Sequence, residues 1–257
     1  MIYTVPVILS TRGRSRLTTQ WLQAGGVAAS NTLRALDYYG NTVPASLAPT
    51  IHIPLIGSDL TSALILAEGY GTYSATNNGP FTSGDYSEST GLSGVGKSGC
   101  YLELNASSPT NAAGSLGMYV RSIGSHASSV HVWGSRNGAD GAAVRFRISN
   151  ALNSFLSQPG TTTTTVHTGF ISQSWNGTLV GGSSSLYQSG SLVATVSASP
   201  SSGSTTLKAF AEPAVSTSVW QGVCGGLVWW NRELTASEWS QYAAIYQRFQ
   251  ELLGRNV

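Results

Sequence analysis

The chain ends in NRELTASEWSQYAAIYQRFQELLGRNV (residues 231–257), a segment denser in charged and large apolar residues than the sequence before it. Thr235 followed by Glu238 three residues later is the pattern of a capping box. Large apolar residues then recur at spacings of three and four, as on one face of a helix. They are Trp239, Tyr242, Ala243, Tyr246, Phe249 and Leu253. The pattern predicts an amphipathic helix over residues 236–253, stopped by Gly254.

This predicted C-terminal helix needs a surface to pack on, because an isolated helix of its length is marginally stable in water. Leu234 and Trp239 fit a hydrophobic staple, which sets the angle at which the chain enters the helix. We interpret the helix as a terminal latch. It covers one end of a sheet, or it anchors the N-terminal segment.

The chain from residue 90 to the latch consists of short runs, most of them alternating, separated by turn signals such as Asn-Gly and Ser-Gly. No helical pattern interrupts them. The predicted strands are CYLELN (100–105), LGMYVRS (116–122), SSVHVWGSR (128–136), AAVRFRIS (142–149), VHTGFISQSW (166–175), SSLYQSG (184–190), SLVATVSA (191–198), TTLKAFAE (205–212) and GVCGGLVWWNR (222–232). The sequence therefore predicts a mainly β protein, an antiparallel β-sandwich or jelly roll.

The first part of the chain differs in texture from the strand-rich body. We expect residues 1–75 to form an N-terminal extension that docks onto the main domain or onto a partner, and residues 76–257 to form the sandwich. SNTLRALDYYG (30–40) indicates a short amphipathic helix within the extension.

Two further segments carry backbone signals. Pro49 and Pro54 argue against a central strand in the extension, because proline cannot donate to a β-ladder. Five consecutive threonines at 161–165 favour extended backbone, and we expect them to form a loop leading into a strand.

Composition bounds the classes of protein that fit. Charged residues make up 9% of the chain, against about 25% in an ordinary soluble domain. The net charge of +2 gives no strong attraction to nucleic acid or to an anionic membrane, so we expect neither as a partner.

No apolar run is long enough to span a bilayer. The N-terminus, MIYTVPVILSTRGRSR, places its apolar run before its basic residues, the reverse of a secretory signal, so we expect synthesis in a cytoplasm without a signal peptide.

Several stretches resemble the concanavalin A-like, or laminin G-like, jelly-roll domains. The last strand leads into N-R-x-L-T-x-x-E, and TGLSGVGKSGCYLELN (90–105) followed by LGMYVRS is similar to the early strands of that family. LYQSGSLVATV (186–196) resembles its Y-x-N-G-x-L-V-A hairpin, with Ser189 where Asn is usual. The resemblance covers about residues 90–255. The preceding LQAGGVAASNTLRALDYY (22–39) is most similar to lectin-like proteins of tailed-bacteriophage virions.

This resemblance implies a virion structural protein, a lectin-like module displayed on the capsid or tail. It implies attachment to other virion proteins through the N-terminal segment, assembly as a homo-oligomer in the particle, and binding of host-surface or environmental glycans. The family also contains lectins, glycanases and adhesion modules, and fold alone does not choose among them. The alternatives are a free carbohydrate-binding module or adhesin, and a glycan hydrolase.

A glycan hydrolase needs paired carboxylates at a defined separation. The glucanase members of the family have E-x-D-x-E on one strand, and this chain has no such run. Its acids are scattered: Asp85 and Glu88 lie in a turn-rich stretch, and Glu103 stands alone. There is no G-x-S-x-G nucleophile motif, and His131 in VHVWG is expected to share a strand face with Trp133. We expect no catalytic residues, no glycan hydrolysis and a protein that is not an enzyme.

Sugar binding commonly uses an aromatic ring against the apolar face of a pyranose, with polar groups around it. Trp133, Trp175 and Trp220 adjoin turns and are the tryptophans most open to this role; their alternative role is to cap the core at strand ends. Asn137 and Asp140 in the neighbouring RNGADG are further candidate ligand-binding residues. They are also the best candidates for binding Ca²⁺, although the same residues are typical of a hairpin turn. We expect no other metal and no cofactor.

Arg12, Arg14 and Arg16 alternate in TRGRSR. They are either a docking arm that meets acidic groups on another subunit or solvated surface arginines. Three phosphate contacts would be weak and sensitive to salt. Cys100 and Cys224 lie in apolar runs, and we expect two buried thiols.

Overall fold

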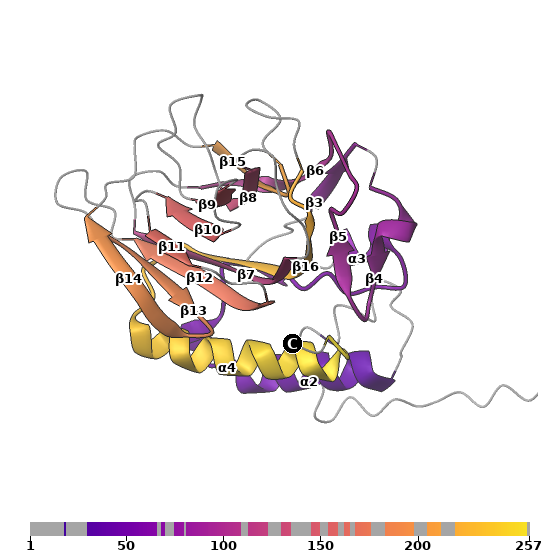
Figure 1. Cartoon of the computed structure of the whole chain (residues 1–257). Coiled ribbons are helices and arrows are strands. Elements are labelled where there is room, and N and C mark those ends of the chain that lie inside the picture. The colour runs from indigo at the N-terminus through magenta and orange to yellow at the C-terminus, as the bar shows by residue number, and fades with distance from the viewer. Residues whose placement is uncertain are drawn as a thin grey trace, which may run out of the picture.

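The computed structural model describes residues 18, 30–65, 68–69, 75–79, 81–108, 113–122, 130–134, 145–149, 154–158, 162–164, 168–175, 183–197, 205–211 and 219–255. In these residues two antiparallel sheets face each other, and two long helices lie together on the outer side of one sheet (Figure 1). The predicted antiparallel β-sandwich with a C-terminal helix is confirmed.

The nine-stranded sheet lies next to the helices. Its strand order is β14 (Ser191–Ser197), β13 (Ser183–Gln188), β12 (Thr168–Trp175), β7 (Gly114–Ser122), β16 (Gly222–Trp230), β1 (Ile51–Ile53) and β2 (Glu68–Gly69), and the β4 (Tyr86–Ser87)–β5 (Gly91–Ser93) hairpin pairs with β16. The seven-stranded sheet has the order β11 (Thr162–Thr164), β10 (Ser154–Gln158), β9 (Arg145–Ser149), β8 (Val130–Gly134), β15 (Thr205–Ala209), β6 (Tyr101–Ser108) and β3 (Ala75–Asn78). All nine predicted strands are present.

Two expectations about local structure are wrong. Thr162–Thr164 do not form a loop but the strand β11, which pairs with β10; β-branched residues suit a pleated strand. Ile51–Ile53 form β1, a strand inside the nine-stranded sheet between β16 and β2. Pro49 and Pro54 flank β1 rather than lie in it, so β1 itself keeps every amide hydrogen that the ladder needs.

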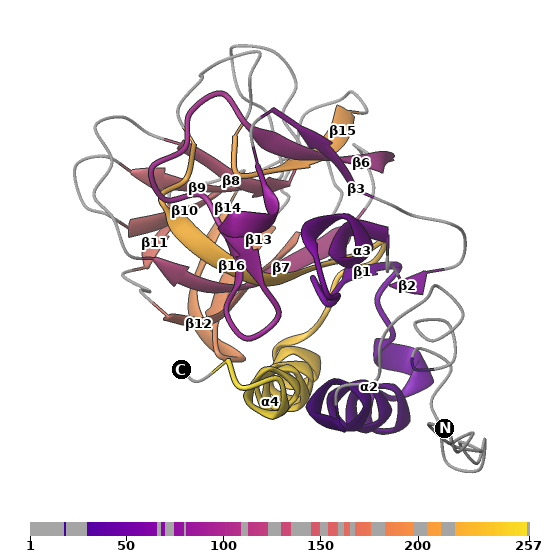
Figure 2. The same ribbon diagram turned by 90° about the vertical axis from the view of Figure 1, so that its right-hand side faces the viewer.

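Residues 30–65 therefore pack as part of the sandwich. Helix α2 (Ser30–Thr42) runs beside the C-terminal helix α4 (Ala236–Leu252), as Figure 2 shows end-on. The hydroxyl groups of Tyr39 and Tyr242 join the two helices at 2.7 Å. The short 3₁₀ helix η1 (Ala45–Leu47) then leads into β1, and helix α3 (Leu60–Ile65) follows it. None of the described helices is long and apolar enough to cross a membrane.

Strand alternation divides the apolar residues of the nine-stranded sheet between two cores. In β12, Ile171 and Trp175 join the core between the sheets, whereas Phe170 joins the core under the helices. Opposite the aromatic face of α4, β7 carries a small residue, Gly117, whose missing Cβ leaves room for the ring of Phe170. The core under the helices buries the apolar face of α4 and so removes its large aromatic side chains from water.

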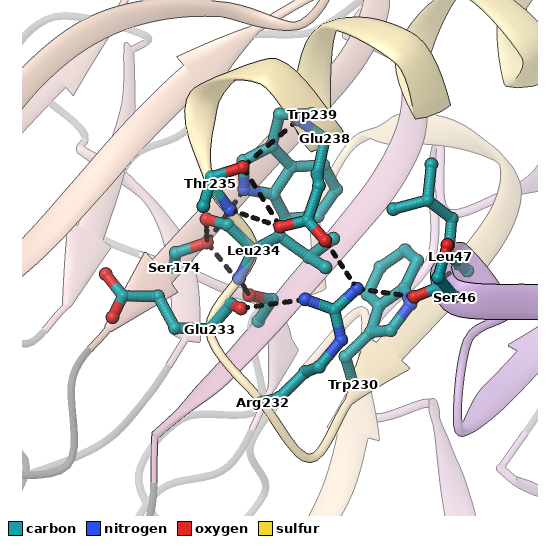
Figure 3. A network of polar contacts seen from close by, with 11 residues as sticks. Ser46, Leu47, Ser174, Trp230, Arg232, Glu233, Leu234, Thr235, Glu238 and Trp239 are labelled. Atoms are coloured by element: carbon teal, nitrogen blue, oxygen red, sulfur yellow. Dashed lines mark hydrogen bonds and ion pairs between the residues drawn. The ribbon is translucent and has the colours of Figure 1, made fainter.

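The start of α4 is held by the capping box that the sequence predicted. The Thr235 side chain accepts a hydrogen bond from the Glu238 amide, and the Glu238 carboxylate accepts one from the Thr235 amide. Arg232 links this turn to the N-terminal part of the chain (Figure 3). Its Nη2 atom lies 2.8 Å from a Glu238 carboxylate oxygen and donates a hydrogen bond to the Ser46 carbonyl oxygen at 2.5 Å. The hydrogen bond from Arg232 holds the pKa of Glu238 below its usual value.

The turn between β13 and β14 packs against α4 and gives a first stability prediction. Gly190 has a φ of +81°, and a Cβ there would lie 2.6 Å from the Ser240 Cα and 2.9 Å from the Trp239 carbonyl oxygen. Gly190→Ala adds overpacking to backbone strain, so we expect it to lower the free energy of unfolding by about 2–4 kcal/mol. Gly96→Ala is the matched control, because Gly96 has a φ of +71° and no atom within 4 Å of a Cβ. Chemical denaturation of both variants tests this: equal losses would show that the turn does not press on the helix.

Candidate functional site

The three tryptophans named as candidate sugar-binding residues are fully buried between the sheets, in keeping with the alternative role of capping the core. Trp133, Trp175 and Trp220 each have 0% exposure. The Trp133 indole donates to the Val228 carbonyl oxygen at 3.3 Å, and the ring of Trp175 lies 5.2 Å from that of Trp229. An aromatic platform needs an open ring face, so these three are wrong as sugar-binding residues. Adjacency to a turn in sequence did not keep them on the surface. Trp133 of β8, Trp175 of β12 and Trp220, which lies just before β16, all join the core between the sheets.

A register shift explains why Trp133 lies in the core. Simple alternation predicts that His131 and Trp133 share a face, but the β8–β9 pairing shifts by one residue between them. Val132 and Trp133 both join the core between the sheets. His131 is buried, with its Nε2 2.9 Å from the Lys208 carbonyl oxygen on the neighbouring strand β15.

The other predicted site residues lie outside the described residues. They are Asn137, Asp140, Arg12, Arg14 and Arg16. The Ca²⁺ assignment and the docking arm therefore stay predictions. Within the described part of the chain, no group of three or more His, Cys, Asp or Glu side chains is placed to hold a metal ion.

The scattered acids of the turn region have structural contacts. Asp85 caps the 3₁₀ helix η2 (Ser83–Asp85) and lies 2.7 Å from the Lys97 ammonium. Burial opposes ionisation of Asp85, but hydrogen bonds from Lys97 and Thr82 outweigh it and lower the pKa of this carboxyl. The Glu88 carboxylate accepts a hydrogen bond from Thr32 of α2. These contacts tie the two acids to different partners rather than to one substrate position.

Residues 91–98, GLSGVGKS, fit the spacing of a phosphate-binding P-loop. The motif needs a strand before it, a helix after it and free backbone amides. Here β6 follows instead of a helix, and the amides of Gly94, Gly96 and Lys97 bind Gly222, Gln221 and Gly94 oxygens. The match is therefore part of the connection from β5 in one sheet to β6 in the other, and not a phosphate-binding loop.

Both cysteines are buried free thiols, as predicted. Burial raises the pKa of Cys224 to about 12 and also raises the pKa of Cys100. Neither is a reactive thiolate at neutral pH.

The outer side of the seven-stranded sheet carries a different set of side chains. In β6, Leu102 and Leu104 enter the core, and the alternating residues are partly or fully exposed. The long helices α2 and α4 do not cover this side, because they lie beyond the other sheet (Figure 1). We call this set the polar face; it consists of Thr76, Asn78, Tyr101, Glu103, Asn105 and Lys208.

Three residues form the centre of the polar face. Lys208 is opposite Glu103 in register, and its Nζ lies 3.8 Å from the Glu103 carboxylate oxygen. The same ammonium lies 5.6 Å from the centroid of the Tyr101 ring, within cation–π range. The Lys208 side chain is 18% exposed and that of Glu103 is 39% exposed. Tyr101 is partly buried and also packs against the core between the sheets. The cluster therefore offers the exposed part of an aromatic ring, a cation and a carboxylate at one place.

Two strands supply the rest of the polar face. On β3, Thr76 stands opposite Glu103 and Asn78 stands opposite Tyr101. Hydroxyl and amide groups next to an aromatic ring are the kind of groups that hydrogen-bond sugar hydroxyls. In the sequence Glu103 stands alone, because Lys208 is more than a hundred residues away. The alternation in TTLKA and CYLELN was the available signal, and strand pairing was the missing information.

The sequence matches no family model, and no curated protein matches it. Among solved structures, the chain is similar to a mutant of Trypanosoma rangeli sialidase displaying trans-sialidase activity, with a TM-score of 0.54 and 13% identity over 94% of this chain and 38% of that one. It is similar to the Trypanosoma rangeli sialidase complex with 2,3-difluorosialic acid, with a TM-score of 0.55 and 12% identity over 83% of this chain and 34% of that one. For the botulinum neurotoxin serotype D binding domain the TM-score is 0.52, with 8% identity over 77% of this chain and 52% of that one.

These likenesses show the fold, a lectin-like β-sandwich, since all the identities are low. The chain spans less than two fifths of the sialidase chains. They also correct one expectation. The missing E-x-D-x-E run led to the prediction that the protein is not an enzyme, whereas structures that share its fold over most of its length are sialidases. The motif of one glycanase family is thus no basis for excluding enzymes from this fold.

Proposed function

We propose that this chain is a lectin-like β-sandwich module that binds glycans through the polar face and is displayed on the virion of a tailed bacteriophage. The observation that carries glycan binding is the Tyr101–Glu103–Lys208 cluster on the side of the sandwich that the helices leave open. A sugar has apolar faces rimmed by hydroxyl groups. The ring of Tyr101 complements such a face, and the flanking polar groups complement the hydroxyls.

Display on a virion is supported by features of the sequence. The low charge content, the abundance of Gly, Ser and Thr, and the order of the jelly-roll motifs favour it over a free carbohydrate-binding module or adhesin. In this proposal the segment with Arg12, Arg14 and Arg16 attaches the module to capsid or tail proteins, where it assembles as a homo-oligomer. Mass spectrometry of purified particles tests this, and peptides from this chain found only outside the particles would rule it out.

Glycan binding is tested with a glycan array and the purified full chain. We expect Tyr101→Ala to weaken binding by about three- to tenfold, as for loss of one aromatic contact. Tyr38→Ala is the matched control, because Tyr38 is a partly buried tyrosine of α2 on the opposite side of the sandwich. Equal binding by the two variants would remove the polar face from the proposal. Because sialidases share the fold, the bound glycans are also assayed for released sugar.

A further inference from the structure

We infer that the glycan bound at the polar face is acidic and that Lys208 is the side chain that pairs with its carboxylate or sulfate. This inference rests on the proposed function and adds the chemical class of the ligand. Its starting point is the distribution of charge between the two sheets.

The described strands of the seven-stranded sheet carry three basic residues, Arg145, Arg147 and Lys208, against one acid, Glu103. The described strands of the nine-stranded sheet carry Arg121 and Glu68, which balance. The seven-stranded sheet thus has a net charge of +2, equal to that of the whole chain. A local excess of one sign raises the concentration of ligands of the opposite sign at that surface.

Strand register groups the basic positions. Gly134 of β8 stands opposite Lys208 on one side and opposite Arg145 on the other. The row across four neighbouring strands is therefore Glu103, Lys208, Gly134 and Arg145. A residue without a side chain lies between two basic positions in this row. An anionic group bound at Lys208 would meet the ammonium directly, and a charged hydrogen-bond partner selects a carboxylate or sulfate over a neutral hydroxyl.

The ion pair between Lys208 and Glu103 is easily exchanged for one with a ligand. The 3.8 Å separation from Glu103 is too long for a hydrogen bond, and Glu103 is 39% exposed. Ion pairs that water reaches contribute little, so a ligand carboxylate can replace this one without a large loss. Contact with the Tyr101 ring keeps the ammonium over the surface on which the sugar would lie.

The experiment compares polysaccharides that differ only in charge. Binding of the full chain is measured to polygalacturonate and its methyl ester, and to dextran sulfate and dextran. We expect the two acidic polymers to bind and the two neutral ones not to, with affinity that falls as salt is raised. Binding to neutral glycans alone would overturn the inference but leave the proposed function intact. Binding to none of these polymers and to nothing on the array would overturn both.

Charge variants separate a local site from overall charge. We expect Lys208→Gln to weaken binding to the acidic polymers at least about tenfold. Arg248→Gln removes the same charge from the exposed face of α4 and is expected to leave binding unchanged. Glu103→Gln removes the competing carboxylate and is expected to tighten binding several-fold, a gain that a misfolded variant cannot produce. Equal losses for Lys208→Gln and Arg248→Gln would overturn the assignment of Lys208.

Discussion

Trp239→Ala is expected to lower the free energy of unfolding by about 3–5 kcal/mol, the range for truncation of a buried aromatic residue. Trp239 is 0% exposed and belongs to the core between α4 and the nine-stranded sheet. Its ring centroid lies 5.1 Å from that of Trp230 and 5.9 Å from that of Phe170. Removing it opens a cavity at the first turn of the helix, among buried rings that are already packed against one another and fill the space only in part.

Trp239 also has a polar contact that can be tested apart from its volume. The indole Nε1 donates to the Ser174 hydroxyl at 2.7 Å, and that hydroxyl lies 2.8 Å from both Ser115 Oγ and the Leu234 carbonyl oxygen (Figure 3). Trp239→Phe keeps a ring and loses this hydrogen bond, so we expect a smaller loss of about 1–2 kcal/mol.

Urea denaturation measures both Trp239 variants, with Ser240→Ala on the exposed side of the same turn as the control. A urea denaturation curve that Trp239→Ala leaves unchanged would show that the C-terminal helix does not pack on the sheet.

Arg255→Met is expected to lower the free energy of unfolding by about 2–4 kcal/mol, because it removes the five hydrogen bonds that the buried guanidinium donates. The Arg255 side chain donates to the carbonyl oxygens of Glu88 at 2.8 Å, Pro54 at 3.2 Å and Leu55 at 2.6 Å. It also donates to the Gly225 carbonyl oxygen and to Gln250 Oε1. One guanidinium thus joins the residues after β1, the β4–β5 turn and the bulge of β16.

The expected loss is a balance of two effects. Burial lowers the pKa of Arg255, which reflects the cost of placing this cation away from water. Methionine removes that cost, and this offsets part of the loss of five acceptor contacts. The planar, forked guanidinium suits several acceptors at once, so we expect Arg255→Lys to be destabilised as well.

Arg248→Met is the matched control for Arg255→Met. Arg248 is exposed near the same end of α4 and pairs with Glu251, and we expect a change below about 0.5 kcal/mol. Equal denaturation midpoints for the two variants would mean that the Arg255 contacts contribute nothing to stability.

Local patterns predicted much of the fold. The capping box at Thr235 and the apolar stripe after it involve residues within one or two helical turns, so they can be predicted without knowledge of the tertiary structure. Alternation located the nine strands for the same reason. Prediction was wrong at β1 and β11, where three-residue strands flanked by proline or made of threonine depend on the neighbours with which they pair.

The candidate site was much less predictable. The place of Trp133 beside a turn left both a surface role and a core role open, and a one-residue register shift puts it in the core. Tyr101, Glu103 and Lys208 are ordinary residues in the sequence, and they form a cluster only because β6 and β15 are neighbours. Which strands are neighbours is a property of the whole sheet and not of any one segment.

By itself, the sequence determined the class of the protein: a charge-poor chain of short alternating strands, ended by a capped amphipathic helix. Only the tertiary structure decided which tryptophans are buried, that residues 51–53 complete a sheet, and that a lysine, a tyrosine and a glutamate share one open face. The physical reason is range. Capping and alternation act between residues a few positions apart, whereas burial and register are set by contacts between segments far apart in the chain.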